Sequence, residues 1–221
     1  MSENPETAFT QPFLRLPKKK TLLIVTGGPG TGKSSLAKRL LARLADVSAI
    51  SYDEIKEKDW DLFGFDSTAQ KDRLNAWALE EFYFTMQKQM WEEKTILIEY
   101  PFYQRHKPRL QELIEEYDYT AVTIFLYADM RTVYERGCMR DGDGSRHPGH
   151  LLHAYHKETF TPDMLQKEPD TCASFEGFCA GIAPKEYNIR LGLQIPVDVS
   201  DYSKIDYEGI LHQIIEYEKT L

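Results

Sequence analysis

A glycine-rich loop near the N-terminus constrains the fold of this chain more than any other feature. Residues 27–34 read Gly-Gly-Pro-Gly-Thr-Gly-Lys-Ser and satisfy every fixed position of the phosphate-binding pattern G-x-x-x-x-G-K-[ST]. A strand-like run, 21–25, precedes the loop, and a helix-forming run, 36–44, follows it. Glycines can bring successive backbone N–H groups around an anion at the positive end of the next helix. The sequence therefore predicts a binding site for the phosphates of a nucleotide.

The same pattern predicts which side chains hold magnesium and ATP. Lys33 is placed to reach the β- and γ-phosphates, and the hydroxyl of Ser34 is placed to bind the Mg²⁺ that bridges them. ATP and Mg²⁺ are therefore the predicted cofactors, with Ser34 as the predicted metal ligand. The predicted nucleotide-binding residues are Gly27, Gly28, Pro29, Gly30, Thr31, Gly32, Lys33, Ser34 and Ser35.

Length and composition limit the number of domains and the kinds of partner. A chain of 221 residues with 42% hydrophobic residues can bury one full core, so we expect a flexible leader, 1–20, and a single domain, 21–221. The formal net charge of −8 gives no general attraction to nucleic-acid phosphates and favours a small anionic ligand at a local site. The three cysteines are an odd number in a chain too large to need disulfides, and the sequence has no membrane-spanning run, which predicts a cytoplasmic protein.

Strand-like and helical runs alternate along the chain, which predicts a three-layer α/β fold. The expected strands are 21–25, 47–51, 95–99, 121–127 and 193–199. The expected helices are 36–44, a long helix from a cap at 67–70 to about 93, 107–117, 130–140 and 207–219. Residues 60–66 are expected to form a loop. Five large side chains of the long helix are expected to lie mostly in the core: Trp77, Phe82, Phe84, Met86 and Trp91.

A carboxylate follows the second expected strand. Asp53 lies two residues beyond the run 47–51. Open α/β sheets bind their ligands at the carboxyl ends of their strands. Asp53 is therefore the second candidate site residue.

A basic segment, 131–150, has the features of a lid. Its first sixteen positions contain four arginines, and it contains glycines that allow the backbone to bend. Arg136 and Arg140 are four residues apart and share one helix face. We expect them, with Arg146, to clamp the transferring phosphates, because phosphoryl transfer needs positive charge at the γ-phosphate beyond that of the loop lysine. The alternative is an ordinary helix face that pairs with acidic neighbours.

Two further segments have no predicted catalytic role. His147, His150, His153 and His156 recur every three residues, but Pro148 and Gly149 interrupt the helix between the first two. Closed zinc sites need four convergent ligands, so we predict no structural metal here. The segment 161–191 carries turn-forming prolines and glycines, and we expect it to shape the substrate pocket.

Several motifs together resemble the bacterial P-loop kinases that are often described as AAA-family ATPases of the zeta toxin and polynucleotide kinase type. The likeness spans about 21–215 and rests on the phosphate loop, 51–53, 64–66 with 71–74, 134–136 with 146–150, and 199–207. It implies a mostly parallel five-stranded sheet in the order 2-3-1-4-5, with helices on both faces and an arginine-rich lid. It also implies that Asp53 is the general base or orienting group for an attacking hydroxyl, and that 199–203 borders the adenine.

One residue departs from the wider P-loop pattern. The apolar strand 95–99 ends with Glu99, whereas the second Mg²⁺ motif of these proteins usually ends with Asp. Glu99 could hold a Mg²⁺-bound water, contact the acceptor or cap a turn, and the sequence does not choose among these roles. The segment 161–191 has no counterpart in the family pattern, so the acceptor is not assigned.

These observations predict an ATP-dependent phosphotransferase that moves the γ-phosphoryl group to a hydroxyl of a small molecule, such as a nucleoside, sugar or antibiotic. The predicted catalytic residues are Lys33, Asp53, Arg136 and Arg140. A 5′-hydroxyl polynucleotide kinase is one alternative, and the net charge of −8 argues against it. The other is a nucleotide-binding switch or ATPase that acts on a partner protein; the lid arginines and Asp53 favour transfer. The sequence does not indicate an oligomeric state.

Overall fold

A parallel five-stranded sheet forms the centre of the computed structural model, which describes residues 13–17, 20–167 and 174–221. Its strand order is β2-β3-β1-β4-β5, and every neighbouring pair is parallel. The predicted fold class and strand order are therefore confirmed. The strands are β1 (Thr21–Gly27), β2 (Val47–Ser51), β3 (Thr95–Glu99), β4 (Thr120–Tyr127) and β5 (Leu193–Asp198).

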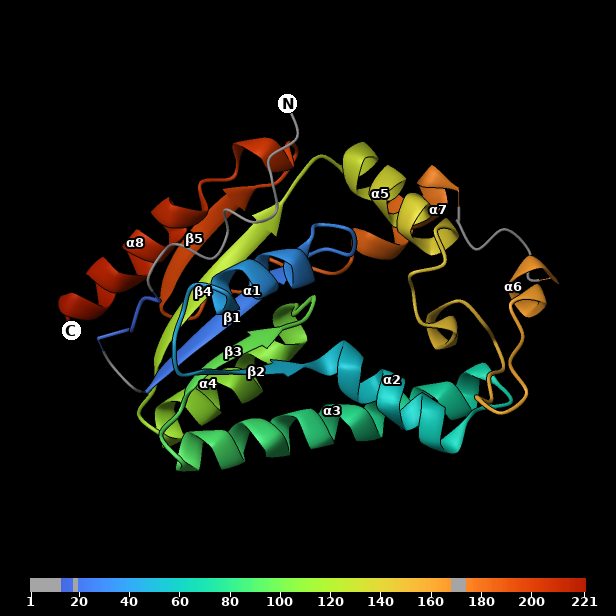
Figure 1. The fold of residues 1–221 in the computed structure, drawn as a ribbon, viewed down its shortest axis with the longest axis horizontal. Helices are drawn as coiled ribbons and strands as arrows, with labels where there is room; N and C mark the ends of the chain where they lie inside the picture. Colours follow the sequence, from blue (N-terminus) through green and yellow to red (C-terminus); the bar gives the residue numbers. More distant parts are fainter. Residues whose placement is uncertain (1–12, 18–19, 168–173) are drawn as a thin grey trace.

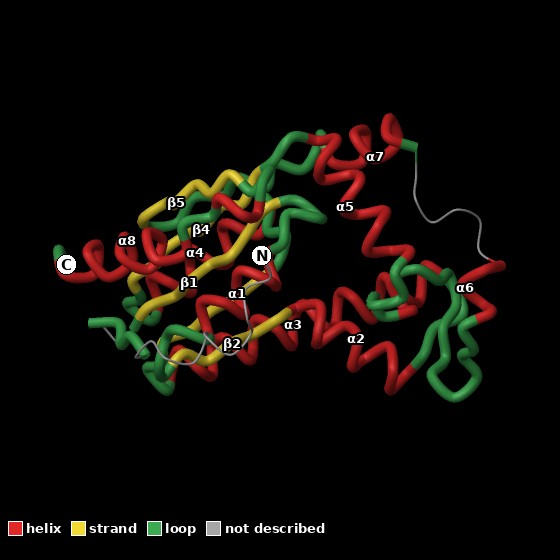
Figure 2. Tube along the Cα trace, turned by 45° about the horizontal axis from the view of Figure 1, so that its top comes forward, coloured by secondary structure: helices red, strands yellow, loops and turns green. Residues whose placement is uncertain are grey.

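Helices cover both faces of this sheet (Figures 1 and 2). Successive side chains of β1 point to opposite faces, so Leu22 and Ile24 join a core with helix α3, whereas Leu23 and Val25 join a core with α1 and α8. Because both faces are covered, β1 is apolar almost throughout and wholly buried. The α-helices are α1 (Lys33–Leu41), α2 (Tyr52–Phe63), α3 (Thr68–Trp91), α4 (Lys107–Glu116), α5 (Met130–Gly142), α6 (Asp163–Lys167), α7 (Phe175–Ile182) and α8 (Tyr207–Lys219).

A third, smaller core lies away from the sheet. Trp60, Phe65, Leu152 and Tyr155 are each buried and pack against one another. Backbone hydrogen bonds between Phe65 and Tyr155 fasten the segment after α2 to the segment after the predicted lid. Figure 1 shows α2 and one end of α3 reaching beyond the sheet toward α6. This part of the chain, centred on the third core, forms an arm next to the sheet.

The predicted loop at 60–66 is wrong over its first four residues. Helix α2 begins at Tyr52, where the Ser51 side chain accepts a hydrogen bond from the Glu54 N–H, and it continues to Phe63. It ends at Gly64, whose positive φ of 63° is a backbone conformation that favours glycine. Trp60 is on the buried side of this helix and is 1% exposed. Burial of that aromatic ring favours the extra helical turn over a loop.

The prediction that the five large side chains of α3 lie mostly in the core is correct for only part of the set. Phe82 and Met86 are fully buried. Trp77, Phe84 and Trp91 are instead 63%, 69% and 80% exposed. The helix has apolar side chains on two opposite faces, and only one of those faces meets the sheet.

Three further expectations concern the leader, the cysteines and membrane-spanning helices. Of the predicted leader, 1–12 and 18–19 lie outside the described residues, whereas Leu14 pairs with Leu44 and packs against the α1 core. Cys179 is free, but Cys138 is disulfide-bonded, which departs from the expectation that the cysteines form no disulfide. Over the described parts of the chain, no helix has the length and apolar character needed to cross a membrane.

Candidate active site

The phosphate loop connects the central strand β1 to helix α1 at the carboxyl edge of the sheet. Gly30 and Gly32 have φ values of 81° and 83°, which other residues rarely adopt. No side chain caps α1 at Gly32, so the first N–H groups of the helix are left for an anion. A Cβ on Gly32 would lie 2.7 Å from the Tyr202 hydroxyl, so the loop is also closely packed. This backbone fits the phosphates of a nucleotide.

Lys33 turns back over the loop. Its Nζ donates a hydrogen bond to the Gly28 carbonyl at 3.0 Å. Burial lowers the pKa of Lys33 to about 8, although the carboxylates of Glu99 and Asp53 oppose this shift. The site therefore disfavours the charged form of this amine unless an anion lies beside it. Bound phosphate would supply that anion.

Ser34 and Glu99 meet where α1 passes the end of β3. The Ser34 hydroxyl oxygen lies 3.0 Å from each carboxylate oxygen of Glu99, and the Ser51 hydroxyl donates to the same carboxylate at 3.2 Å. Burial raises the pKa of Glu99 above its usual value, and the Ser34 hydrogen bond and the Lys33 charge only partly offset this. Hydroxyl and carboxylate oxygens are the ligands that Mg²⁺ prefers. The sequence left the role of Glu99 open; in the structure it lies beside the predicted metal ligand.

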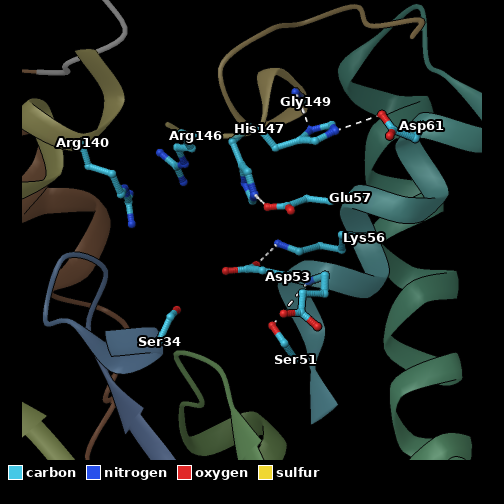
Figure 3. A network of polar contacts seen from close by, with 12 residues as sticks. Ser34, Ser51, Asp53, Lys56, Glu57, Asp61, Arg140, Arg146, His147 and Gly149 are labelled. Atoms are coloured by element: carbon cyan, nitrogen blue, oxygen red, sulfur yellow. Dashed lines mark hydrogen bonds and ion pairs between the residues drawn. The ribbon is translucent and has the colours of Figure 1, made fainter. Parts of the chain in front are cut away.

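Asp53 is in the first turn of α2 and points toward Ser34 and Arg140 (Figure 3). Its carboxylate is 2.6 Å from the Nζ of Lys56, one turn further along the helix. Burial alone would raise the pKa of Asp53, but the charge and hydrogen bond of Lys56, with His150 and Lys33, lower it below its usual value. Asp53 is therefore held as an ionised carboxylate.

Lys56 was not identified from the sequence. Its Nζ lies over the Tyr52 and Trp60 rings, 4.8 and 5.4 Å from their centroids, and its side chain is only 12% exposed. The spacing of Asp53 and Lys56, three residues apart at a strand end, is the signal that could have indicated the pair.

The two arginines of the predicted lid have different surroundings. Arg136 donates to the carbonyl oxygens of Val199 and Ser200 at 2.6 and 2.8 Å, and its guanidinium lies 3.9 Å from the centroid of the Tyr202 ring. Among the described residues, Arg140 forms an ion pair only with its neighbour Asp141, at 3.2 Å. Arg136 is thus fixed to the segment after β5, whereas Arg140 faces the open centre of the site (Figure 3).

The far end of the predicted lid is anchored to α2. His147 pairs with Asp61 at 3.0 Å and His150 pairs with Glu57 at 2.8 Å. Burial lowers the pKa of His150, although Glu57 opposes the shift. Gly149 packs directly on Trp60, because a Cβ there would lie 2.4 Å from the ring. These histidines therefore bind separate carboxylates of α2 instead of converging on one point.

Two cavities meet at this site. One, of about 390 Å³, lies against the phosphate loop and extends to Arg136 and Tyr202; we call it the loop cavity. The other, of about 660 Å³, lies between α1, the start of α2 and 144–150; we call it the α2 cavity. The lining residues that both cavities share are Ser34, Asp53 and Arg140.

The segment 161–191 borders neither of these cavities in its described part. Residues 168–173 lie outside the described structure. Ile182 and Tyr187 instead line a third cavity of about 410 Å³, on the side of the phosphate loop where Gly28 lies. We expected this segment to shape the substrate pocket. Its described residues instead line the third cavity, beside the phosphate loop.

Comparison with solved structures identifies the fold. A provisionally assigned kinase from Chloroflexus aurantiacus has a TM-score of 0.67 and 22% identity, covering 92% of this chain and 98% of that chain. Shikimate kinase from Bacteroides thetaiotaomicron has a TM-score of 0.50 and 16% identity over 89% of this chain and 97% of its own. A sugar kinase from a Janibacter species has a TM-score of 0.50 and 12% identity over 90% and 94%. At these identities the likeness establishes the fold alone.

Comparison of the sequence identifies the family. Comparison with curated proteins gives no match. A family model described as an AAA domain matches residues 23–146, which is more than half of the chain. The resemblance predicted from the sequence is therefore confirmed: this chain belongs to the AAA domain family and has the fold of the P-loop kinases.

Proposed function

We propose that the protein is an ATP-dependent phosphotransferase that moves the γ-phosphoryl group to a hydroxyl of a small molecule. The observation that carries this proposal is the meeting of two cavities at Ser34, Asp53 and Arg140. A phosphotransferase needs one site for the donor and one for the acceptor, with the phosphoryl group passing between them. A nucleotide switch needs only the first site.

The loop cavity is the proposed donor site. Backbone N–H groups of the loop and the Lys33 ammonium would hold the β- and γ-phosphates. Ser34, with Glu99 beside it, would hold Mg²⁺, which would supply positive charge to neutralise the phosphates. Arg136 and Tyr202, stacked at the far end of the cavity, would border the adenine.

The α2 cavity is the proposed acceptor site. Its volume of about 660 Å³ is within the roughly 300–1,000 Å³ of small-molecule sites. Acidic and basic side chains both line it, including Glu54, Glu57 and Arg146, which suits a small polar molecule better than a uniformly anionic strand. Small hydroxylated molecules are therefore the proposed acceptors.

The transfer step follows from the shared residues. The acceptor oxygen attacks the γ-phosphorus, the bond from that phosphorus to the β–γ bridging oxygen breaks, and ADP leaves with its electron pair. Asp53 would accept the proton of the acceptor hydroxyl. Arg140 would stabilise the negative charge on the transferring group.

A screen of acceptors with γ-labelled ATP tests this proposal. Nucleosides, sugars, hydroxylated antibiotics and 5′-hydroxyl oligonucleotides would be compared, and we expect label to transfer to one class of small molecule. Asp53→Asn should strongly reduce transfer and leave ATP binding nearly unchanged. Label recovered only as inorganic phosphate, at equal rates in the wild type and in Asp53→Asn, would instead identify a hydrolytic switch. Label transferred only to oligonucleotides would identify a polynucleotide kinase.

A further inference from the structure

An exposed aromatic face runs along helix α3, on the side turned away from the sheet. Trp77, Phe84 and Trp91 are 63%, 69% and 80% exposed, and each is seven residues from the next. Seven residues are nearly two helical turns, so the three side chains form one line, which we call the aromatic stripe. The opposite face of α3, with Phe82 and Met86, is buried. Large contiguous apolar patches are uncommon on the surface of soluble monomers and often mark interaction sites.

The order of side chains along the aromatic stripe, Trp-Phe-Trp, is the same in both directions along the helix. Phe84 is its centre, and a tryptophan lies seven residues to either side, about 10 Å away along the helix axis at roughly 1.5 Å per residue. An interface with twofold symmetry requires a surface that is complementary to itself. If two copies of α3 pack antiparallel about Phe84, that residue meets its own equivalent and Trp77 meets Trp91 of the second copy.

The exposed charges beside the stripe have the matching arrangement. Glu80 lies four residues before Phe84, and Lys88 lies four residues after it; all three are exposed. In an antiparallel pair centred on Phe84, Glu80 of each copy therefore faces Lys88 of the other copy. Both pairs are of opposite charge. A parallel pair would place like charges level with one another, which is unfavourable.

A hollow at one end of the stripe matches a projecting side chain at the other end. A cavity of about 270 Å³ is lined by Phe63, Leu74 and Trp77 among others, and the Phe63 and Trp77 rings are stacked with centroids 6.1 Å apart. Antiparallel pairing places Trp91 of the second copy at this end. Trp91 is 80% exposed and is the most exposed of the three stripe residues.

We propose that the aromatic stripe of α3 is a homodimer interface in which two copies of this chain pack antiparallel about Phe84. At roughly 150–250 Å² for each aromatic side chain, six such side chains supply about 640–1,060 Å² of apolar surface at the exposures observed here. Specific interfaces bury about 1,200–2,000 Å² in total, so the neighbouring side chains of α2 and α3 need to supply the remaining area. This interface does not depend on the proposed phosphotransfer.

Sedimentation velocity over a wide range of protein concentration tests the proposal. The wild type should form a concentration-dependent dimer. Phe84→Glu should raise its dissociation constant by roughly 100-fold or more, because one substitution removes both central aromatic side chains and places two like charges together. Leu221→Glu is the matched control, since Leu221 is also exposed but lies on another part of the surface. Circular dichroism and ATP binding would show that both variants fold.

Exchange of the two charges tests the antiparallel register. Glu80→Lys and Lys88→Glu should each weaken the dimer, because each creates two like-charge pairs. An equimolar mixture of the two variants should dimerise again, since every cross-pair is then of opposite charge. A monomer at all concentrations would overturn the proposal and indicate a different occupant of the stripe. A dimer that survives Phe84→Glu, or charge variants that fail to rescue each other, would also overturn it.

Discussion

The Ser34 hydroxyl lies 3.0 Å from both carboxylate oxygens of Glu99, which joins the start of α1 to the end of β3. The contact follows from strand order, because β3 and β1 are neighbours and Glu99 is level with Val25, just before the phosphate loop. A hydroxyl and a carboxylate at this distance from each other make an oxygen-rich site at the point where the phosphates of a nucleotide would arrive.

Glu99→Gln should weaken Mg²⁺-dependent turnover by roughly 10–100-fold, the usual effect of losing a supporting group at a metal site. Burial raises the pKa of Glu99, so this carboxylate becomes protonated at a higher pH than an ordinary glutamate. As pH falls through that range, the Mg²⁺ concentration that the wild type needs for half-maximal turnover should rise. Magnesium titrations of turnover at several pH values measure both effects. Glu112→Gln, an exposed carboxylate of α4, is the control. An unchanged Mg²⁺ requirement in Glu99→Gln would show that Glu99 does not support the metal.

ATP binding should be accompanied by proton uptake by Lys33. Burial lowers the pKa of its amine to about 8 in the free protein, and bound phosphates raise it again by stabilising the cation. Uptake should therefore be seen above pH 8 and be absent well below it. Calorimetry in buffers of different ionisation enthalpy measures this proton. Lys33→Ala should eliminate the uptake and abolish turnover; normal turnover by the folded variant would contradict the assignment.

Asp53→Asn should reduce kcat by roughly 10²–10⁴-fold, the range for loss of a general base, and should leave nucleotide binding nearly unchanged. Lys56→Gln should raise the pKa of Asp53, because the ammonium that now favours the carboxylate is removed. The base is active when ionised, so the acidic limb of the kcat/KM profile should move to higher pH in this variant. Lys58→Gln, two residues further along α2 and 71% exposed, should leave the profile in place. A loss of ATP binding in Asp53→Asn would give Asp53 a metal-binding role instead.

Arg136 and Arg140 should differ in their effects on kinetics. Arg136 is held by two backbone carbonyls beside Tyr202, so Arg136→Ala should raise KM for ATP by about tenfold with a smaller effect on kcat. Arg140 lines both cavities, so Arg140→Ala should lower kcat by roughly 10²–10³-fold. Steady-state kinetics with the same acceptor compares them. Equal losses of kcat in the two variants would support the original prediction that both arginines clamp the transition state.

The lid should become ordered on nucleotide binding, but over part of its length only. Amides from Arg131 to Arg146 should gain protection from hydrogen exchange when a non-hydrolysable ATP analogue and Mg²⁺ are added. Those from His147 to His150 should change little, because Asp61, Glu57 and Trp60 of α2 already hold this end. Equal protection of 131–146 with and without the analogue would refute the lid.

Local sequence was sufficient for the features that depend on short-range patterns. The phosphate loop, the five strands and the basic helix of the lid were predicted because each has its own spacing of glycine, apolar or charged residues. The resemblance also gave the correct strand order. Asp53 could be chosen as a candidate because the end of a strand is visible in the sequence.

Only the tertiary structure determined which side chains meet. Glu99 became a neighbour of Ser34 because two strands distant in sequence lie side by side. Arg136 and Arg140 share a helix face, yet one reaches the segment after β5 and the other the centre of the site. The apolar residues of α3 likewise could not be assigned to core or surface, because periodicity shows that a helix has apolar faces but not which face a sheet will cover. Long-range packing made that choice.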